Sequence, residues 1–398
     1  MRRPLQLTLC LTHDCTLRCR YCYAGRKYAH AMSRETAERG MDIGLAEALR
    51  TGRGVDLSFF GGEPLMEWEL LQHCFGYLKQ RGAAQGVRVR FGLTTNGTLL
   101  TRDRLEWLAE RDFLVGLSID GSPAMHNQNR CHADGRGSHA EVAAALELIQ
   151  QFPSLRCKII CVVNPANHHL LVEGMQWLHT HHHGNIGLNF DFWSKWSDAQ
   201  FDSLKAQLEQ LQQLILESYR RVQPMRIANF EDKMRSALYP ADQFCARCHI
   251  GEQEIAVSVD GNFFPCSRLV GEGDNPELTF GHVNTGIDRA RQHLIISQRG
   301  NATPVCKVCS VRHRCMNSCG CTNYAGSGHF NQVSPFLCNL EQTLIFLADH
   351  LVEHLFKEQD KTLIRLFSSP PLLRSRDTMP LLPKPPASQT SDLFWMNQ

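Results

Sequence analysis

Three cysteines near the amino terminus constrain this chain more than any other feature of its sequence. They are Cys15, Cys19 and Cys22, separated by three and then by two residues, and they follow a short apolar segment. Three thiolates from one tight loop can bind three irons of a [4Fe–4S] cube and leave the fourth iron open to an outside ligand. A zinc site or a disulfide is the alternative, but zinc needs a fourth ligand and only His13 lies nearby. The loop therefore favours an iron–sulfur cluster with one open position.

Composition limits the classes of protein to consider. The 398 residues, 43% of them hydrophobic, are enough for one barrel-sized domain and a smaller one. The net charge is only +2, so we expect no nucleic-acid partner. Since no segment reaches transmembrane length and no apolar signal core follows the amino terminus, we expect a cytoplasmic protein without a membrane partner. Seventeen cysteines in such a chain favour metal binding over disulfides.

Hydrophobic periodicity predicts six strands that alternate with helices. The expected strands are residues 5–12, 55–60, 88–94, 113–119, 156–163 and 186–191. The first helix should begin at Ser33 and bury Met41, Leu45, Ala48 and Leu49. Later helices are expected at residues 67–82, 101–112, 138–152, 168–180, 198–222 and 340–357. This alternation predicts an α/β fold of parallel strands with right-handed crossovers, whose functional loops gather at the carboxyl ends of the strands.

Polar and glycine-rich loops follow these strands. After the second strand comes Gly61-Gly62-Glu63-Pro64, in which the glycines permit close backbone approach and the carboxylate can accept from an ammonium group. Thr94 to Gly97 and Ser118 to Gly121 follow the next two strands, although Asn-Gly and Asp-Gly pairs also serve as plain turns. Asp191 ends the sixth strand and is expected to point at the mouth. The loops thus predict one polar site at one edge of the sheet.

A second set of cysteines occupies the last third of the chain. It consists of Cys245, Cys248, Cys266, Cys306, Cys309, Cys315, Cys319 and Cys338. Apolar alternation at 255–259 and the turn at Asp260-Gly261 predict a β-hairpin before Cys266. Zinc knuckles use the same Cys-x2-Cys spacing, so zinc is an alternative here too. Cys321 lies two residues from Cys319 and could replace it as a ligand.

Together these motifs resemble a known family. The first loop, with Tyr21 directly before Cys22, resembles the signature of radical S-adenosylmethionine (radical SAM) enzymes, and the second cysteine set resembles their SPASM domain. The resemblance implies an open, partial (β/α)6 TIM-like barrel followed by a small cysteine-rich domain. We expect the barrel at residues 1–235, the SPASM domain at 236–358 and a proline-rich, extended or disordered tail at 359–398.

The resemblance also implies cofactors and their ligands. In the family, the open iron of the first cluster binds the methionine moiety of S-adenosylmethionine, which is cleaved to a 5′-deoxyadenosyl radical. The expected cofactor contacts are Tyr21, Gly61, Gly62, Glu63, Pro64, Asn96, Ser118, Arg130 and Asn164. Residues 126–130 of this chain depart from the family's His-Asp-x-x-Arg segment, because Asn127 stands where the family has an aspartate. Cys245, Cys248, Cys266 and Cys319 would hold one auxiliary [4Fe–4S] cluster, and Cys306, Cys309, Cys315 and Cys338 a second, so three clusters are expected.

The resemblance implies an enzyme that acts on a peptide or protein. We interpret it as a maturase that abstracts a hydrogen from a ribosomally made precursor peptide and forms a cyclophane or thioether crosslink, supplied with electrons by a flavodoxin or ferredoxin. The alternative is an anaerobic sulfatase-maturating enzyme, which makes formylglycine. Those enzymes carry an aspartate base directly after the third auxiliary cysteine, where this chain has Ser267. Asp191 is therefore our candidate base.

An alternative of another class is a non-catalytic iron–sulfur electron carrier. Three clusters alone do not establish a catalytic cycle. The Gly61-Gly62-Glu63-Pro64 motif argues against a carrier, because electron transfer requires no loop that binds an ammonium group. The sequence therefore favours the enzyme.

The first prediction concerns iron content. Three complete cubes should give about twelve irons per chain after anaerobic reconstitution, because the three-cysteine and eight-cysteine sets are separate. Iron, sulfide and zinc analysis of the purified protein measures this directly. A content of about four irons, or stoichiometric zinc in place of iron, would contradict it.

Overall fold

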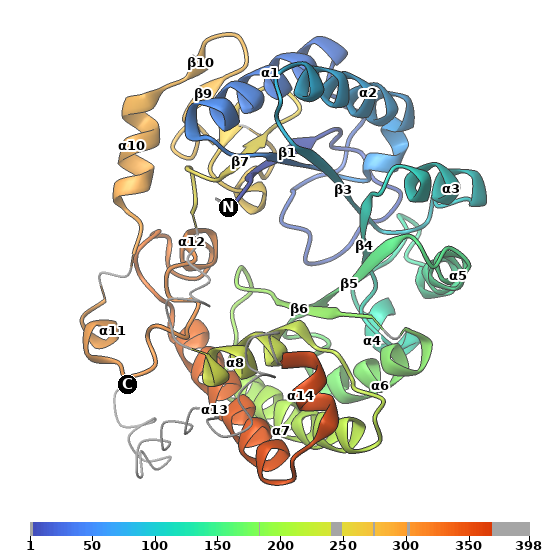
Figure 1. Ribbon diagram of the computed structural model, residues 1–398, viewed down its shortest axis with the longest axis vertical. Helices are drawn as coiled ribbons and strands as arrows, with labels where there is room; N and C mark the ends of the chain where they lie inside the picture. The colour runs from blue at the N-terminus through green and yellow to red at the C-terminus, as the bar shows by residue number, and fades with distance from the viewer. Residues whose placement is uncertain (1–2, 183, 240–248, 274, 301–302, 368–398) are drawn as a thin grey trace.

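The computed structural model describes residues 3–182, 184–239, 249–273, 275–300 and 303–367, and its main element is one eight-stranded sheet (Figure 1). The strand order is β6-β5-β4-β3-β2-β1-β7-β8. All neighbours from β6 to β7 are parallel, whereas β8 is antiparallel to β7. The strands are β1 Leu5–Cys10, β2 Val55–Phe60, β3 Val89–Thr95, β4 Leu114–Ser118, β5 Arg156–Val163, β6 Ile186–Phe190, β7 Glu254–Val257 and β8 Phe263–Phe264. A separate hairpin pairs β9 (Gly281–His282) with β10 (Gly286–Ile287).

Helices follow the strands along the outer side of the arc that Figure 1 shows. Those of the first part are α1 Arg34–Thr51, α2 Trp68–Ala84, α3 Arg102–Glu110, α4 Pro123–Asn127, α5 His139–Gln150, α6 Leu171–His181, α7 Asp198–Arg220 and α8 Ala228–Leu238, with 3-10 turns η1 Pro64–Glu67 and η2 His168–Leu170. Those of the second part are η3 Ser267–Leu269, α10 Arg289–Ser297, α11 Pro304–Val308, α12 Gly320–Ser327, α13 Pro335–Lys357 and α14 Lys361–Phe367. Within the described ranges, no helix has the length and apolarity to cross a bilayer.

The predicted α/β partial barrel is confirmed, and its six strands lie within two residues of their predicted ends. Two details differ. The hairpin expected in the second cysteine region does form, but its first strand, β7, extends the barrel sheet by pairing with β1. The prediction that Leu49 belongs to the buried face of α1 is wrong, since 47% of it is exposed near the helix end. The helices α4, α8, α10, α11, α12 and α14 were not predicted, and the expectation of an extended or disordered tail from residue 359 is wrong for residues 361–367, which form α14.

The expected domain boundary after residue 235 falls inside α8, which packs against α13 of the second part. The division into a barrel and a SPASM domain therefore stays a prediction. Cys245 and Cys248 lie outside the described residues, as does the proline-rich tail from residue 368 onward.

Close packing of α1 on β1 fixes the strand that leads to the first cysteine loop. Leu5, Leu7 and Leu9 point to the helix side and are at most 1% exposed. Gly44 of α1 permits this approach, because a Cβ atom there would lie 2.6 Å from a methyl carbon of Leu7. On the other face, Cys10 stands at the carboxyl end of the strand, just before the loop.

The hairpin β7–β8 brings the second cysteine set to the same edge of the sheet. Leu7 pairs with Ile255 and Leu9 with Val257, so β7 continues the parallel register of β1. Gly261 turns the chain with a φ of 93°, a value that favours glycine, as the Asp-Gly pair predicted. Cys266 follows two residues after β8 and thus lies beside the barrel mouth.

An aromatic cluster at the centre of the barrel wall should control stability. Phe113 is fully buried, and its ring lies 5.6 Å from that of Phe91 and 6.2 Å from that of Phe59. We expect Phe113→Ala to lower the free energy of unfolding by about 3–5 kcal/mol, because it leaves a cavity. Anaerobic urea denaturation measures the change. The matched control, Leu49→Ala at the exposed end of α1, should change it by less than about 1 kcal/mol.

Candidate active site

The first cysteine loop, residues 12–22, crosses the carboxyl ends of the strands and is held at both sides. On one side, Gly62 N donates to Thr12 O at 2.7 Å and Glu63 N donates to Asp14 O at 2.8 Å. On the other side, backbone amides of the loop donate to the carbonyls of Asn129 and Cys131 at 3.0 and 2.7 Å. Leu17, fully buried, anchors the loop between them. These contacts fix the backbone that carries Cys15, Cys19 and Cys22.

The surroundings of the three sulfurs suit thiolate ligands. Leu17 N and Asn96 Nδ2 approach Cys15 Sγ at 3.4 and 3.5 Å, and such donors stabilise a metal-bound sulfur. Burial raises the pKa of Cys19 to about 12, against the lowering effect of Arg130, and metal binding would overcome this because the ligand is the thiolate. Among the described residues, no three His, Cys, Asp or Glu side chains form a site for a single metal ion. A cube would bind each thiolate through a different iron, and the donors beside Cys15 suit such a ligand.

Glu63 is a buried carboxylate beside this loop. It is 1% exposed and accepts hydrogen bonds from Thr95 Oγ1 at 2.7 Å and from Asn96 N at 2.8 Å. Burial raises its pKa to about 7, although these hydrogen bonds act in the opposite direction. The carboxyl group can therefore change its charge near neutral pH, in contrast to an exposed glutamate.

Gly61 and Gly62 are required by the approach of the first cysteine loop. Gly61 has a φ of 123°, which favours glycine. A Cβ atom on Gly61 would collide with Thr12 O, and one on Gly62 would overlap Asp14 O. The sequence predicted close approach to a ligand, whereas the structure shows close approach to the protein's own loop. Pro64 is buried and begins the turn η1.

Arg130 lies in a buried ion pair under the loop. Its Nε is 3.0 Å from Asp120 Oδ2, and the two side chains are 6% and 0% exposed. Tyr21 donates from its hydroxyl to the same oxygen at 2.5 Å, and its ring lies 5.3 Å from the guanidinium carbon. Although burial lowers the pKa of Arg130, the charge of Asp120 raises it well above the usual value. Sequence reasoning missed Asp120 because an Asp-Gly pair reads as a turn.

The remaining predicted cofactor contacts also lie at carboxyl ends of strands. Asn96, after β3, donates to Thr16 Oγ1 of the first cysteine loop at 3.0 Å. Ser118 is buried at the end of β4. Asn164, after β5, exchanges two side-chain hydrogen bonds with Asn129, at 3.0 and 3.2 Å. The structure thus brings the predicted residues to one edge of the sheet, and their contacts with a cofactor stay predictions.

Asp191 makes local contacts at the end of β6. Its side chain accepts hydrogen bonds from Trp193 N at 2.9 Å and from both the backbone and the hydroxyl of Ser194, at 3.2 and 2.6 Å. Such bonds are typical of a turn-forming aspartate. The carboxylate is therefore engaged in shaping the loop after β6, and its role as a base stays a prediction.

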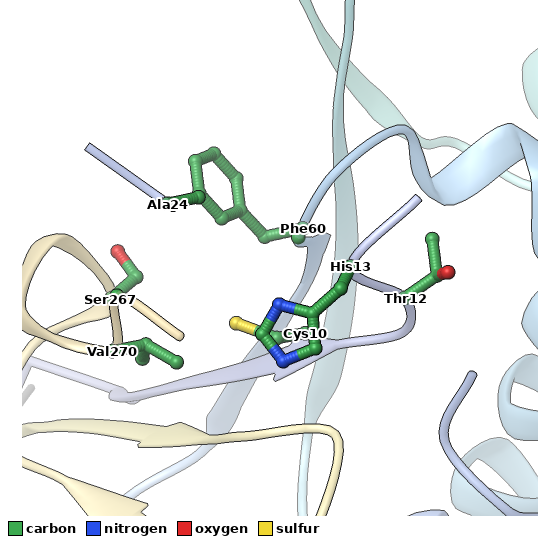
Figure 2. Close-up of a pocket in the computed structure, with 9 residues that line it drawn as sticks. Cys10, Thr12, His13, Ala24, Phe60, Ser267 and Val270 are labelled. Carbon is green, nitrogen blue, oxygen red and sulfur yellow. The ribbon is translucent and has the colours of Figure 1, made fainter. Parts of the chain in front are cut away.

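Ser267 lines a small pocket between the barrel mouth and the second cysteine region (Figure 2). Gly61 and the barrel-facing residue Cys10 contribute to the same pocket. The described residues that line it are Cys10, Thr12, His13, Ala24, Phe60, Gly61, Ser267, Val270 and Gly271, and these include no carboxylate. The segment after Cys266 and the glycine motif after β2 thus face one space.

The sulfur of Cys321 lies beside Arg268 together with two sulfurs of the second cysteine set, those of Cys266 and Cys319. Cys319 Sγ is 3.6 Å from Cys321 Sγ. A hydrogen bond with Cys321 lowers the pKa of Cys266, so these two side chains are also in contact. Although burial lowers the pKa of Arg268, the neighbouring Cys321 raises it. Cys319 and Cys321 both lie near Cys266, and which of them serves as a cluster ligand stays open.

Of the other four cysteines of the second set, Cys306 lies in α11, Cys309 and Cys315 lie between α11 and α12, and Cys338 lies in α13. Cys338 Sγ accepts a hydrogen bond from Gln342 Nε2 at 3.0 Å. Burial raises the pKa of Cys338, the hydrogen bond with Gln342 lowers it, and the charge of Cys309 raises it. Burial raises the pKa of Cys315 as well, and the charge of Cys338 contributes in the same direction. Cys309, Cys315 and Cys338 thus influence one another electrostatically, and their binding of a second auxiliary cluster stays a prediction.

Comparison with known proteins places this site in context. Residues 9–177 match the Radical SAM superfamily. A cysteine-type anaerobic sulfatase-maturating enzyme of Clostridium perfringens is 23% identical over 331 residues, which cover 77% of this chain and 85% of that protein. The sequence similarity therefore extends over most of both chains.

Two solved structures share the fold. The structure of anSMEcpe with bound AdoMet and Cp18Cys peptide has a TM-score of 0.74 and 19% identity, and the match covers 89% of this chain and 99% of that one. Streptococcus suis SuiB bound to precursor peptide SuiA has a TM-score of 0.59 and 15% identity, over 84% of this chain and 76% of that one. At these identities the similarity shows the fold.

A substitution at Gly62 tests the contact between the two loops. We expect Gly62→Ala to displace Asp14 and to reduce the iron bound by Cys15, Cys19 and Cys22, because the new methyl group would overlap the carbonyl oxygen. Iron analysis and the electron paramagnetic resonance signal of the reduced first cluster measure the effect. Gly76→Ala on α2 is the control, since its Cβ would meet no atom within 4 Å. Equal iron content in both variants would show that the contact is dispensable.

Proposed function

Since this chain is a radical SAM enzyme related to the anaerobic sulfatase-maturating enzymes and to SuiB, we propose that it modifies a residue of a peptide. The observation that carries the proposal is the convergence of three segments at one mouth. The first cysteine loop, the buried Glu63 and the segment at Cys266-Ser267 all reach it. A peptide substrate would enter between the barrel and the second cysteine region.

The protein's own residues would bind and orient the cofactors. Cys15, Cys19 and Cys22 would hold the first cluster, which together with S-adenosylmethionine supplies a 5′-deoxyadenosyl radical. The Glu63 carboxylate would accept a charge-assisted hydrogen bond from the amino group of the methionine moiety. Burial of the carboxylate strengthens such a bond. Arg130, already paired with Asp120, would have to redirect part of its guanidinium to reach a carboxylate.

We propose that the product is a crosslinked peptide of the cyclophane or thioether type. The support is the absence of a carboxylate among the residues that line the pocket beside Ser267. A serine hydroxyl is itself a poor proton acceptor, so chemistry that depends on a carboxylate at position 267 is disfavoured. Proton release in a crosslinking reaction would then use another group, for which Asp191 is the candidate.

Formylglycine formation is the second candidate. It is favoured by sequence similarity to an anaerobic sulfatase-maturating enzyme over 77% of the chain and by the fold of anSMEcpe. Under this reading, a group other than residue 267 would serve as the base. Because the chain is a radical SAM enzyme, the non-catalytic electron carrier is set aside.

The auxiliary clusters and the electron supply complete the proposal. The two auxiliary [4Fe–4S] clusters would accept an electron from the substrate radical or stabilise the second region. A flavodoxin or ferredoxin would reduce the first cluster. Iron–sulfur potentials depend on hydrogen bonds and nearby charge, which makes residues around these sites targets for experiments.

Mass spectrometry of co-expressed peptides tests the proposed reaction. The probes are short precursor peptides encoded near this chain and a peptide with a sulfatase-type Cys or Ser. A crosslink removes two hydrogens and resists reaction with a hydrazide, whereas formylglycine carries an aldehyde that reacts with it. Because oxidation of Ser to formylglycine also removes two hydrogens, the hydrazide is essential. Formylglycine as the only product would overturn the crosslinking proposal.

Two substitutions separate the candidate bases. We expect Ser267→Ala to keep most peptide modification, because a serine hydroxyl is a poor proton acceptor and the described residues that line its pocket include no carboxylate. Asp191→Asn should slow modification at least about tenfold while cleavage of S-adenosylmethionine falls less, as for loss of a general base. The ratio of modified peptide to 5′-deoxyadenosine measures this split. A silent Asp191→Asn combined with an inactive Ser267→Ala would contradict the assignment.

The raised pKa of Glu63 predicts a pH dependence of cofactor binding. Only the ionised carboxylate pairs with an ammonium group, so affinity for S-adenosylmethionine should rise as the pH increases through about 7. Calorimetry with the reconstituted protein at about pH 6 and about pH 8 measures the change. Glu63→Gln should weaken binding about tenfold at the higher pH and remove this dependence. An unchanged profile in the variant would exclude Glu63 as the group responsible.

A further inference from the structure

A buried ion pair joins α8 to α13 near the second auxiliary site. Lys233 Nζ lies 2.6 Å from Glu341 Oε2, and the two side chains are 8% and 3% exposed. Lys233 belongs to α8, which follows the barrel strands, and Glu341 belongs to α13. Nothing in the proposed reaction uses either charge directly.

Both charges bind the backbone on either side of Cys315. Lys233 Nζ donates to Arg314 O at 2.8 Å, and Met316 N donates to Glu341 Oε2 at 2.6 Å. The ion pair therefore contacts the residue before and the residue after this cysteine. A shift of Cys315 would break both hydrogen bonds and leave two charges unsatisfied in the interior, which is costly.

Further contacts hold the same segment and its partner cysteine. The Arg314 side chain donates from Nη1 to Asp349 Oδ2 on α13 at 2.9 Å and from Nη2 to Lys233 O at 3.2 Å. Cys338 lies one helical turn before Glu341 on α13. The helix that carries one predicted ligand thus also holds the loop that carries another.

Core stability is a poor explanation for this pair. Replacing a buried ion pair by apolar residues of similar volume is often neutral or stabilising. What apolar side chains cannot provide is two directed bonds to the backbone on either side of one cysteine. A cluster needs its ligands at fixed separations, so rigid placement of Cys315 has a direct use.

We infer that Lys233 and Glu341 are positioning residues for the second auxiliary cluster and that their balanced charges set its potential. The inference rests on the proposed function, because Cys306, Cys309, Cys315 and Cys338 are assigned there as ligands. The two charged groups bind the backbone of Arg314 and Met316, the neighbours of Cys315 in the sequence. Removal of either charge therefore leaves the other one unpaired close to the cluster. A nearby positive charge favours the reduced, more negative cluster, and a nearby negative charge disfavours it.

Redox titration of the full chain, reconstituted anaerobically and monitored by electron paramagnetic resonance, tests this. Loss of a signal in Cys338→Ala identifies the second auxiliary cluster. We expect Lys233→Met to lower its midpoint potential, Glu341→Gln to raise it, and the double variant to return close to the wild-type value. Lys233→Arg keeps the charge and should keep the potential.

The control is an exposed pair on the same helix. Lys357 Nζ lies 2.6 Å from Glu353 Oε1. Lys357→Met should therefore leave the iron content and all cluster potentials unchanged. Glu341→Gln retains an acceptor for Met316 N, so its potential can be measured even where Lys233→Met does not fold.

Two results would overturn the inference. Unchanged potential and iron content in both variants would show that the pair does not act on the cluster, and shifts of equal sign would show only a structural effect. A wild-type chain without a second auxiliary cluster would instead contradict the cofactor assignment of the proposed function. Peptide modification plays no part in these measurements, so the two failures are distinguishable.

Discussion

The parallel pairing of β1 with a neighbour on each side determines where every part of the site lies. The strand pairs with β2 on one side and with β7 on the other, and the first cysteine loop leaves its carboxyl end. The β2 side brings the glycine motif that ends at Glu63, and the β7–β8 hairpin brings Cys266. Because parallel strands end at the same edge, segments far apart in the sequence meet without long connections. Leu7 and Leu9, buried under α1, hold this arrangement in place.

The sequence was informative wherever a local pattern determines the structure. Alternating apolar residues located the strands, and Asp260-Gly261 located the hairpin turn, because both signals depend only on neighbouring residues. The site residues after β2 to β6 could be placed at one edge for a similar reason, since the order of strand-helix units implies a parallel sheet. The addition of β7 to that sheet was not predictable in this way. A hairpin pattern does not specify which strand it will pair with.

Contacts between polar side chains could not be predicted either. Asp120 binds Arg130, and Asn164 binds Asn129, across loops that only the folded barrel brings together. The sequence indicated that Arg130 could bind a carboxylate, but the carboxylate in contact with it belongs to the protein. Asp191 shows the same limit, since its hydrogen bonds to the following turn depend on the backbone path after β6. Residue type predicts what a side chain can bind, and geometry selects the partner.

Buried charge is used twice in this fold to hold a loop that carries cysteines. Asp120 and Arg130 lie under the first cysteine loop, and the residues on either side of Arg130 accept backbone hydrogen bonds from that loop. Lys233 and Glu341 bind the backbone on either side of Cys315. Asp120 accepts a hydrogen bond from Tyr21 of the first loop, and Lys233 and Glu341 bind the backbone around Cys315, so a displaced loop would leave a buried charge without these partners. Such an arrangement penalises small displacements more steeply than apolar contacts do, because hydrogen bonds are directional and dispersion contacts are not. A loop that must present sulfurs at fixed separations needs this resistance to small displacements. The buried charges therefore have a role in positioning the loops, which overall stability does not explain.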